Sequence, residues 1–254
     1  MSVDEYLIWV INRHRGLSGE KSPAYRVAHE ILPMIQEWAV EFLEGVYFSG
    51  SFAKETNIVG SADLDLFISL KSSADRFTLQ YIFNSLHDHI QAKGFDTRKQ
   101  NVSIGMKYYG LDVDLVPGRI QRGYQRYHSL YKSKTDSWTQ TNIHEHIKLV
   151  KNSGRLDEIR GIKIWIKLND LDFPSIYLEL SVIRALKFKT KNQLANNLIS
   201  VFEYLANDFV ENPIFDPANT ANRISDDLNK TEKRLIARKA RETLNQSRWE
   251  NVIW

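Results

Sequence analysis

Two groups of residues in this chain are spaced in a way that suits chemistry on phosphates. The first is the Gly50-Ser51 pair, which reads as a turn after a short β-prone run. A glycine turn can adopt positive φ and lets backbone N–H groups approach a phosphate closely. The second group is acidic: Asp63 and Asp65 open one alternating stretch, and residues 111–117 form another. Clustered carboxylates can hold two divalent ions roughly 3.5–4 Å apart, the arrangement used in many phosphoryl transfers.

The alternation of acidic and apolar residues predicts which face of each strand the carboxylates occupy. Side chains two residues apart in a strand point to the same face, so Asp63 and Asp65 share a face, and so do Asp112 and Asp114. If the two strands pair, one of the later carboxylates lies beside Asp63 and Asp65. Like charges at that distance repel, and a cation between them relieves the repulsion.

A single pair of alternating carboxylates has an equally good structural explanation. Any half-exposed strand shows alternating Asp and Leu, and Asp112 by itself fits that explanation. The combination is much more specific, because a Gly-Ser turn, an Asp-x-Asp strand and a later Asp occur in this order. We therefore interpret the three features together as one site.

Three short stretches carry a resemblance to a known family: Gly-Ser-Phe-Ala at 50–53, Asp-Leu-Asp at 63–65 and Val-Asp-Leu-Val-Pro at 113–117. Together they resemble the signature of the DNA polymerase β-like nucleotidyltransferase superfamily. Within it, the chain is most similar to the branch of oligoadenylate synthases, archaeal-type CCA-adding enzymes and the bacterial relatives of cyclic GMP-AMP synthase (CD-NTases).

Later stretches extend the resemblance over most of the chain, from about Gly45 to about Leu244. Residues 141–148, 162–167 and 177–180 resemble the segments that carry the branch's triphosphate-contacting histidine, lysine and tyrosine. The stretch Phe-Asp-Pro-Ala-Asn-Thr-Ala-Asn at 215–222 looks like the loop that opens with Asp-Pro and ends with Asn before the branch's last helix.

The resemblance implies a role for each residue of the first three stretches. Asp63 and Asp65 would ligate both metal ions, and Asp114 would ligate the ion that activates the attacking hydroxyl. Gly50 and Ser51 would hold the β- and γ-phosphates of the donor nucleotide. Two Mg²⁺ ions suit such an oxygen-rich site, and Mn²⁺ could substitute.

The resemblance also implies three nucleotide contacts from the second half of the chain: His146, Lys163 and Tyr177. Lys163 would neutralise the triphosphate, and Tyr177 would stack on the nucleotide or hydrogen-bond to it. Each residue also has a simpler interpretation, as a helix-start histidine, a helix-surface lysine and a buried tyrosine. Ile143 stands where relatives often have proline, so His144 is an alternative to His146.

The implied activity is template-independent, metal-dependent nucleotidyl transfer. A nucleotide hydroxyl would attack the α-phosphorus of a nucleoside triphosphate and expel pyrophosphate, whose charge the site would stabilise. The leading hypothesis is a bacterial enzyme that joins nucleotides into a cyclic or linear oligonucleotide signal for antiviral defence. Its product would pass to a separate effector protein.

Two other hypotheses differ in the acceptor or in the activity. The first is nucleotide addition to an RNA 3′-end, such as that of tRNA, or to a protein partner. The basic and aromatic stretch 119–134 would support it, because such residues bind phosphates and stack bases, although a solvated loop has the same composition. Nucleic acid is therefore a candidate activator, acceptor or product. The second, a degenerate nucleotide-binding module, is disfavoured because all three carboxylates and the Gly-Ser turn are present.

Composition excludes several classes of protein. The chain has 254 residues, 43% of them hydrophobic, which suffices for one large domain or two small ones. It has no cysteine, which rules out disulfides, thiolate zinc sites and cysteine nucleophiles. A net charge of +3 is too small to indicate nucleic-acid binding by itself. Without a long apolar run or a basic N-terminal region, we expect a cytoplasmic protein with no membrane partner.

The order of elements predicts an α+β fold: a polymerase β-like palm core with a mixed sheet flanked by helices, then a helical domain. We place the first domain, with the N-terminal helices and the catalytic core, at 1–140, and the helical domain that closes the nucleotide cleft at 141–254. Periodicity and breakers predict strands at 46–49, 63–70, about 97–108 and 111–117, and helices at 3–14, 23–44, 75–92, 143–152, 156–168, 175–188, 192–210 and 225–246.

Overall fold

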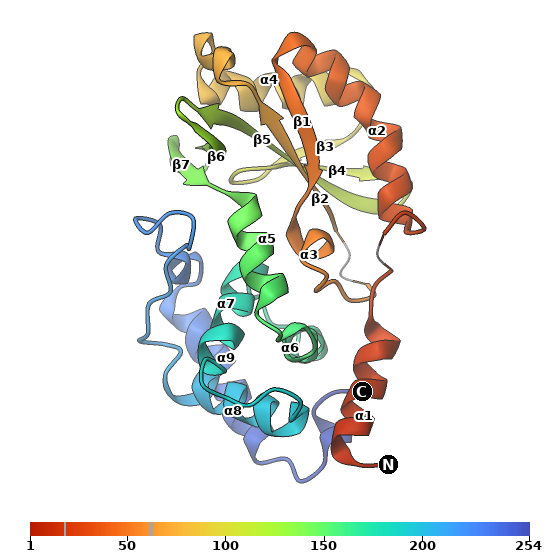
Figure 1. Ribbon diagram of the computed structural model, residues 1–254, viewed down its shortest axis with the longest axis vertical. Coiled ribbons are helices and arrows are strands. Elements are labelled where there is room, and N and C mark those ends of the chain that lie inside the picture. The colour runs from red at the N-terminus through yellow and green to blue at the C-terminus, as the bar shows by residue number, and fades with distance from the viewer. Residues whose placement is uncertain (18, 61–62) are drawn as a thin grey trace. The chain divides into compact units, whose positions relative to one another are not determined.

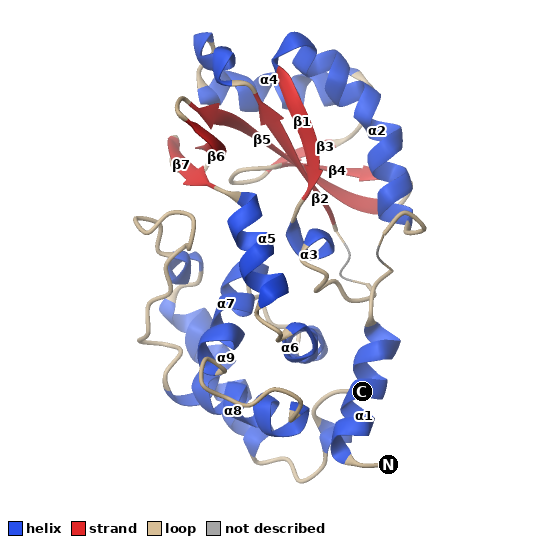
Figure 2. Cartoon of the chain, in the orientation of Figure 1, coloured by secondary structure: helices blue, strands red, loops and turns tan. Residues whose placement is uncertain are grey.

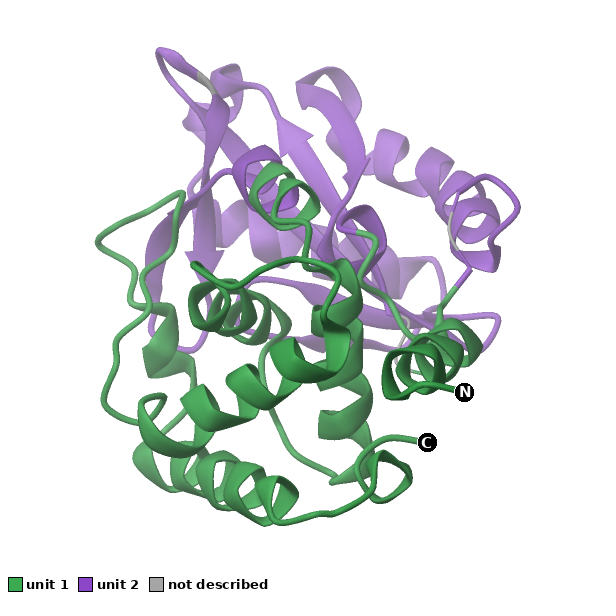
Figure 3. Cartoon of the chain, turned by 60° about the horizontal axis from the view of Figure 1, so that its bottom comes forward, with its two compact units in different colours: residues 1–16, 55–60, 148–254 green, residues 17–54, 61–147 purple. Residues whose placement is uncertain are grey.

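The computed structural model describes residues 1–17, 19–60 and 63–254. Contacts between residues divide the chain into two compact units (Figure 3). Unit 1 comprises residues 1–16, 55–60 and 148–254, and unit 2 comprises residues 17–54 and 61–147. Every strand of the described residues belongs to unit 2, whereas unit 1 is helical (Figure 2).

Unit 2 is built on a seven-stranded mixed sheet (Figure 1). The strand order is β1-β2-β5-β4-β3, and β6 pairs with both β5 and β7. The pair β2–β5 is parallel and the other pairs are antiparallel. The strands are β1 (Leu43–Phe48), β2 (Leu64–Leu70), β3 (Thr97–Lys99), β4 (Ile104–Tyr108), β5 (Leu111–Gln121), β6 (Tyr124–Lys132) and β7 (Ser137–Thr141).

One face of this sheet is covered by two helices, α2 (Pro23–Ala39) and α4 (Leu79–Ala92). Leu64, Leu66 and Ile68 of β2 pack with apolar residues of both helices in one buried cluster. Because strand side chains alternate, Asp65 of β2 points to the opposite face. Burial of the leucine face therefore determines which face presents the carboxylates. Short helices α3 (Gly50–Ala53), η1 (Val40–Phe42) and η2 (Ser72–Arg76) complete this unit.

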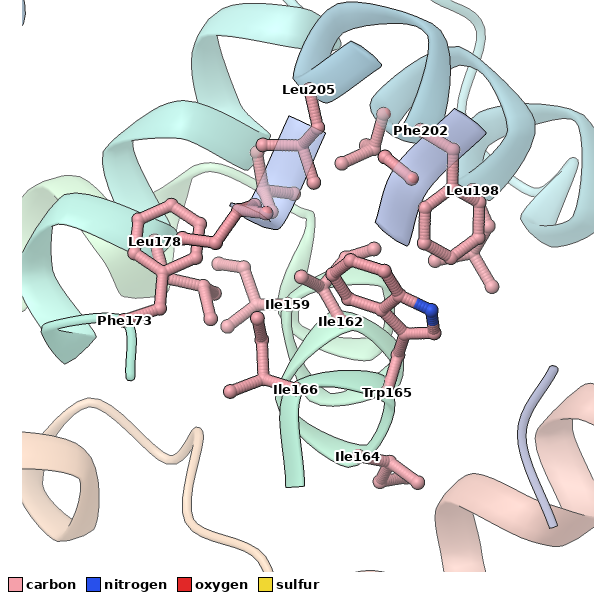
Figure 4. Close-up of a cluster of buried hydrophobic side chains, with 14 of the residues drawn as sticks. Ile159, Ile162, Ile164, Trp165, Ile166, Phe173, Leu178, Leu198, Phe202 and Leu205 are labelled. Atoms are coloured by element: carbon pink, nitrogen blue, oxygen red, sulfur yellow. The ribbon is translucent and has the colours of Figure 1, made fainter. Parts of the chain in front are cut away.

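Unit 1 packs its helices around α6 (Leu156–Leu168), which is buried on nearly all sides from Glu158 to Ile166. Figure 4 shows Trp165 of α6 beside Leu198 and Phe202, and the Trp165 and Phe202 rings meet edge to face with centroids 5.1 Å apart. The other elements are α1 (Val3–His14), α7 (Ser175–Ala185), α8 (Leu194–Asn207), η3 (Ile224–Asp227), α9 (Lys230–Leu244) and η4 (Trp249–Asn251), while α5 (Ile143–Asn152) begins in unit 2 and ends in unit 1.

No helix among the described residues combines the length and the apolar character needed to cross a membrane.

The predicted helices 3–14, 143–152 and 156–168 are confirmed residue by residue. The helix predicted at 23–44 is too long, because it ends at Ala39 and residues 43–48 pair with β2 as a strand. Val40 has φ of 47°, a conformation that a β-branched residue rarely adopts and that stops a helix. Apolar periodicity runs through this break, so the sequence pattern does not reveal it.

The stretch 119–134 is largely sheet, not the solvated loop that its composition also allowed. It contains the end of β5 and all of β6, and β7 follows without having been predicted. Several of its side chains have partners inside unit 2: Arg122 pairs with Asp75, and Arg119 Nη1 donates to the Phe77 carbonyl at 2.8 Å. Strand pairing decides this stretch, and single-sequence periodicity carries little information about it.

The sequence-based division, with a boundary near residue 140, places α1 in the catalytic domain. In the structure, α1 belongs to unit 1, with the C-terminal helices. Leu7, Val10 and Ile11 of α1 belong to the same buried cluster as the C-terminal helices. The amphipathic pattern of residues 3–14 shows that the helix has a buried face, but it does not show which core receives that face.

Candidate active site

The carboxylates of β2 and β5 meet on one face of the sheet of unit 2. Asp65 is the direct partner of Asp114 in the parallel pair of strands. Leu64 is the partner of Val113, which brings Asp63, one residue earlier, level with Asp112. The strand register thus confirms the expectation that pairing brings a later carboxylate beside the Asp-x-Asp motif.

The electrostatics of this face show that the carboxylates crowd one another. Partial loss of solvent raises the pKa of Asp63, and the negative charge of Asp112 raises it further. Burial and then the charge of Asp63 raise the pKa of Asp114, whereas the guanidinium of Arg98 lowers both values. Negative charge on this face therefore costs free energy, and a bound cation would offset that cost.

The Gly-Ser turn lies directly against this face. The Ser49 N–H donates to the Asp65 carbonyl at 2.9 Å, and α3 begins at the next residue. Gly50 has φ of +56°, and a Cβ on it would lie 1.6 Å from Asp65 Oδ2. Glycine is required here both for the backbone angle and for the approach of the turn to the carboxylate. Ser51 follows in the first turn of α3 and is half-buried.

Asp112 differs from Asp114 in its partners. Its carboxylate pairs with Arg98 at 3.6 Å and with Lys107 at 3.7 Å, and both cations come from the neighbouring strands β3 and β4. Asp112 therefore lies between two cations of neighbouring strands, which agrees with the interpretation of this residue as part of a half-exposed strand.

The chemistry of this face fits a hard divalent cation. Asp63, Asp65 and Asp114 offer only carboxylate oxygens, the donors that Mg²⁺ and Mn²⁺ prefer. Their crowding, seen in the raised pKa values of Asp63 and Asp114, is the electrostatic condition for cation binding. Within residues 1–17, 19–60 and 63–254, no three Asp, Glu or His side chains already stand as a ready-made metal cluster.

Lys163 lies in unit 1, on α6, and its ammonium is engaged within that unit. Its Nζ is 2.8 Å from Glu179 Oε1 and 2.9 Å from Thr56 Oγ1, and the lysine side chain is only 9% exposed. Thr56 also donates its hydroxyl to Glu179 at 2.7 Å. The simpler interpretation of a helix-surface lysine is therefore wrong. The predicted contact with the triphosphate stays a prediction.

The same face of α6 holds the segment 55–60, which follows the Gly-Ser turn in the chain. Arg160 donates to the Glu55 carbonyl, and Lys167 Nζ donates to the Val59 carbonyl at 2.8 Å. With Lys163 between them, these residues form a basic stripe at helical spacing. The stripe binds a loop of its own unit.

Tyr177 lies in the core of unit 1. The residue is fully buried, its ring stacks on Phe209 with centroids 5.1 Å apart, and Phe173 meets it edge-on at the same distance. Burial raises the pKa of its hydroxyl far above the ordinary value. These surroundings match the interpretation as a buried tyrosine of an amphipathic helix, and stacking on a nucleotide stays a prediction.

The two candidate histidines occupy the first turn of α5. Asn142 caps this helix, since its Oδ1 accepts from the His144 N–H at 3.2 Å and from the Glu145 N–H at 3.4 Å. His144 is exposed and meets the Tyr47 ring edge-on at 5.8 Å, whereas His146 is half-buried. The structure does not select one of them as a nucleotide ligand.

Unit 2 also contains a cavity of about 590 Å³ that sequence reasoning missed. It is lined by residues of β1, β2, β5, β6 and α5 and by residues 71–73, among them Tyr47, Ser69, Arg126, His128 and His144. His128 is buried, its Nε2 lies 2.8 Å from Ser69 Oγ, and burial lowers its pKa to about 4. The basic and aromatic stretch held the signal, but the cavity requires the pairing of β5 and β6.

The Asp-Pro loop at 215–222 forms a compact turn in unit 1. Asp216 is buried, its Oδ1 accepts from the Ala218 N–H at 2.8 Å, and its backbone N–H donates to the Asn222 carbonyl at 2.9 Å. Asn222 Nδ2 donates back to Asp216 Oδ2 at 3.3 Å. The aspartate and asparagine of this motif therefore stabilise the loop.

No protein-family model matches the chain, and no curated protein matches it either. Solved structures do match it over nearly its whole length. The E. coli MS115-1 CdnC structure, a complex with HORMA-deltaN, superposes with a TM-score of 0.77 at 19% identity and covers 96% of this chain and 90% of its own.

Two further structures agree. The Bradyrhizobium diazoefficiens CD-NTase CdnG, in complex with GTP, has a TM-score of 0.77 at 12% identity, with 96% of this chain and 91% of that chain covered. The Elizabethkingia meningoseptica CdnE cyclic dinucleotide synthase, with GTP and Apcpp, has a TM-score of 0.71 at 11% identity, with 97% and 100% covered. The predicted α+β palm fold is confirmed: the chain has the fold of the bacterial CD-NTase nucleotidyltransferases. At these identities the likeness establishes the fold.

Proposed function

We propose that this protein is a template-independent nucleotidyltransferase that joins nucleoside triphosphates into a cyclic or linear oligonucleotide and releases pyrophosphate. One observation carries the proposal: the Gly50 turn lies against Asp65, and Asp65 is the strand partner of Asp114. A phosphate-approaching turn beside paired carboxylates is the minimum that metal-assisted nucleotidyl transfer requires. The shared fold with nucleotide-bound CD-NTases supports the same activity.

In this proposal, Asp63, Asp65 and Asp114 hold two divalent ions, and Gly50 and Ser51 bind the donor phosphates. The ions would supply Lewis-acid activation of the attacking hydroxyl and stabilisation of the leaving pyrophosphate. The carboxylates orient the acceptor hydroxyl, and the Gly50 backbone admits the phosphate chain. Contacts of His146, Lys163 and Tyr177 with the donor nucleotide are part of the proposal.

The wider role that we propose is production of an oligonucleotide signal in the cytoplasm for bacterial antiviral defence, with a separate effector protein as recipient. Two similar structures support a nucleotide substrate, since both hold GTP, and a third is a complex with a HORMA protein. A protein partner for this chain is therefore part of the proposal.

Nucleotide addition to RNA is a weaker candidate. The stretch 119–134 was its main support, and the arginines at 119 and 122 bind partners within unit 2. Ring contacts and strand pairing engage much of the remainder, including His128. This leaves fewer basic side chains available for an RNA phosphate backbone.

The test is mass spectrometry of products formed by the purified protein from all four ribonucleoside and all four deoxynucleoside triphosphates with Mg²⁺ or Mn²⁺. We expect new oligonucleotides and pyrophosphate from the wild type. The Asp63→Ala/Asp65→Ala double variant should lose at least about 10²–10³-fold in rate, since the electrostatic stabilisation of the reaction is removed.

A matched control is Asp112→Asn, which removes a carboxylate of the same strand and face that is already paired with Arg98 and Lys107. It should retain activity within a few-fold. If products appear only when an RNA 3′-end is supplied, the acceptor is RNA and the proposed function is wrong. Equal activity of the double variant and the wild type would show that the carboxylates do not take part.

A further inference from the structure

Gln100 connects an adjacent turn of the sheet to the proposed metal ligand Asp114. It directly follows β3, and its Nε2 donates to Asp114 Oδ1 at 2.7 Å. Sequence reasoning gave this residue no role. The contact engages Asp114 Oδ1 and leaves Oδ2 for another partner.

The backbone around Gln100 is held at both of its polar groups. Its N–H donates to the Ser103 carbonyl at 2.9 Å, and its carbonyl accepts from the Ser133 hydroxyl at 2.5 Å. Ser133 N–H in turn donates to the Asn101 carbonyl at 2.8 Å. The turn 100–103 is thereby tied to the end of β6, so the side chain of Gln100 starts from a fixed backbone.

Gly105 provides the path from this turn to Asp114. It lies on β4 as the strand partner of both Arg98 and Asp114. A Cβ at position 105 would lie 2.8 Å from Gln100 Nε2 and 2.8 Å from Arg98 Nε, closer than real contacts allow. The two long side chains cross β4 over this glycine to reach β5.

Arg98 and Gln100 make different kinds of contact with the two carboxylates of β5. Arg98 places a positive charge 3.6 Å from Asp112, and Lys107 adds a second cation at 3.7 Å. Gln100 offers Asp114 a neutral amide, which fixes the orientation of the carboxylate without cancelling its charge. Asp112 thus has two cations near its carboxylate, whereas Asp114 accepts a hydrogen bond from an uncharged side chain.

We propose that Gln100 is a positioning residue, which holds the Asp114 carboxylate in the orientation needed to bind a divalent cation. Gly105 permits this contact because it has no side chain. The inference rests on the proposed function in its choice of Asp114 as a ligand. Hydrogen bonds from outside the ligand shell orient ligands and typically change metal affinity by about 10–100-fold.

The test measures Mn²⁺ affinity of the full chain without nucleotide, by the electron paramagnetic resonance signal of free Mn²⁺. Gln100→Met keeps the length of the side chain and removes its donor, so we expect Mn²⁺ affinity to fall about 10-fold or more. Turnover at saturating nucleotide should fall at low Mn²⁺ and recover at high Mn²⁺, while the KM for nucleotide changes little. A residue with a purely structural role would not give that recovery.

The matched control is Gln121→Met, which removes a comparable bond of Gln121 Nε2 to Ser129 Oγ at 3.1 Å in the same sheet. It should leave Mn²⁺ affinity unchanged. If Gln100→Met does not fold, Gln100→Asn retains an amide that is one methylene too short and should show the same loss. Gly105→Ala should also lower the affinity, because its methyl group displaces Gln100.

Three outcomes would overturn the inference. One is wild-type Mn²⁺ affinity in folded Gln100→Met, and another is an equal loss in Gln121→Met. The third is Mn²⁺ binding that Asp114→Asn leaves unchanged, since Asp114 is then no ligand. Failure of the proposed function looks different: a wild type that binds Mn²⁺ through Asp114 but forms no oligonucleotide would contradict the activity and leave the role of Gln100 intact.

Discussion

Buried and half-buried charges are arranged in opposite ways in the two units. In unit 1, Glu179 is fully buried and contacts Lys163 at 2.8 Å, and Glu158 contacts Arg155 at 3.1 Å with both side chains under a tenth exposed. In unit 2, carboxylates face other carboxylates: after burial, the charge of Asp112 raises the pKa of Asp63, and the charge of Asp63 raises the pKa of Asp114. Unit 1 thus contains its own counter-charges, whereas the acidic face of unit 2 is electrostatically suited to receive one.

This difference separates charges that are paired inside the protein from charges that repel one another. A buried ion pair with both partners present contributes little net stability but is costly to break. A group of like charges on a sheet face lowers stability unless a ligand offsets the repulsion, which is typical of binding sites. The comparison predicts that removing a charge should have opposite effects on stability in the two units.

The largest loss of stability should follow from breaking the buried ion pair Lys163–Glu179 of unit 1. Glu179→Ala leaves the Lys163 ammonium buried beside Thr56 without its carboxylate, so the free energy of unfolding should fall by about 3–5 kcal/mol. Urea denaturation followed by circular dichroism measures this.

Two controls sharpen that result. The exposed pair Arg26–Glu30, with atoms 3.9 Å apart, is a surface pair, and Glu30→Ala should cost less than about 0.5 kcal/mol. The double variant Lys163→Met/Glu179→Leu should recover most of the loss, because a packed apolar pair can replace a buried ion pair. A loss in Glu179→Ala no larger than that in Glu30→Ala would break the comparison.

A smaller effect on stability is expected from His128, a buried histidine of unit 2 that is neutral in the folded protein. Burial first, and the charge of His144 second, lower the pKa of His128 from 6.5 to about 4. A lowered histidine pKa means that the unfolded chain takes up the proton first, so stability is present above pH 6.5 and is lost as pH falls toward 4. At pH 5 the loss amounts to about 2 kcal/mol relative to neutral pH.

The measurement compares urea unfolding of the wild type and His128→Gln at pH 7 and pH 5. Glutamine keeps a polar partner for Ser69 and does not titrate in this range. The wild type should lose about 2 kcal/mol more than the variant between the two pH values. Equal losses would mean that His128 does not remain neutral in the folded protein.

The smallest expected effect is a gain in stability, from a substitution on the acidic face of unit 2. Asp63→Asn removes one of the mutually repelling charges, so the melting temperature in the absence of divalent ions should rise by about 1–2 °C. A raised carboxyl pKa means that wild-type stability falls as pH rises through that pKa. The advantage of the variant should therefore be present at pH 7 and shrink as pH falls toward the pKa of Asp63.

Added Mn²⁺ provides the control for Asp63→Asn. The wild type should gain melting temperature on addition of Mn²⁺, because binding to the folded state alone stabilises it, and the variant should gain less. A variant that is less stable than the wild type without any divalent ion would show that Asp63 contributes to the fold. The acidic face would then resemble the paired charges of unit 1.

The sequence alone determined the short-range features of the site. The Gly50 turn, the alternation that puts Asp63 and Asp65 on one face, and the helices at 3–14 and 156–168 depend on neighbouring residues and on fixed periods. The resemblance to nucleotidyltransferases depended on the same local motifs, and the fold confirms it. Local geometry repeats wherever the same pattern occurs, so it can be predicted without knowing the partners.

Tertiary structure alone decided which residues meet. It placed Arg98 beside the Asp112 carboxylate and Gln100 beside the Asp114 carboxylate. It also made Lys163, for which a helix-surface position was the simpler alternative, one partner of a buried ion pair. The physical reason is the same in each case: charge compensation and burial depend on contacts between segments distant in sequence, and those contacts exist only once the strands have paired and the helices have packed.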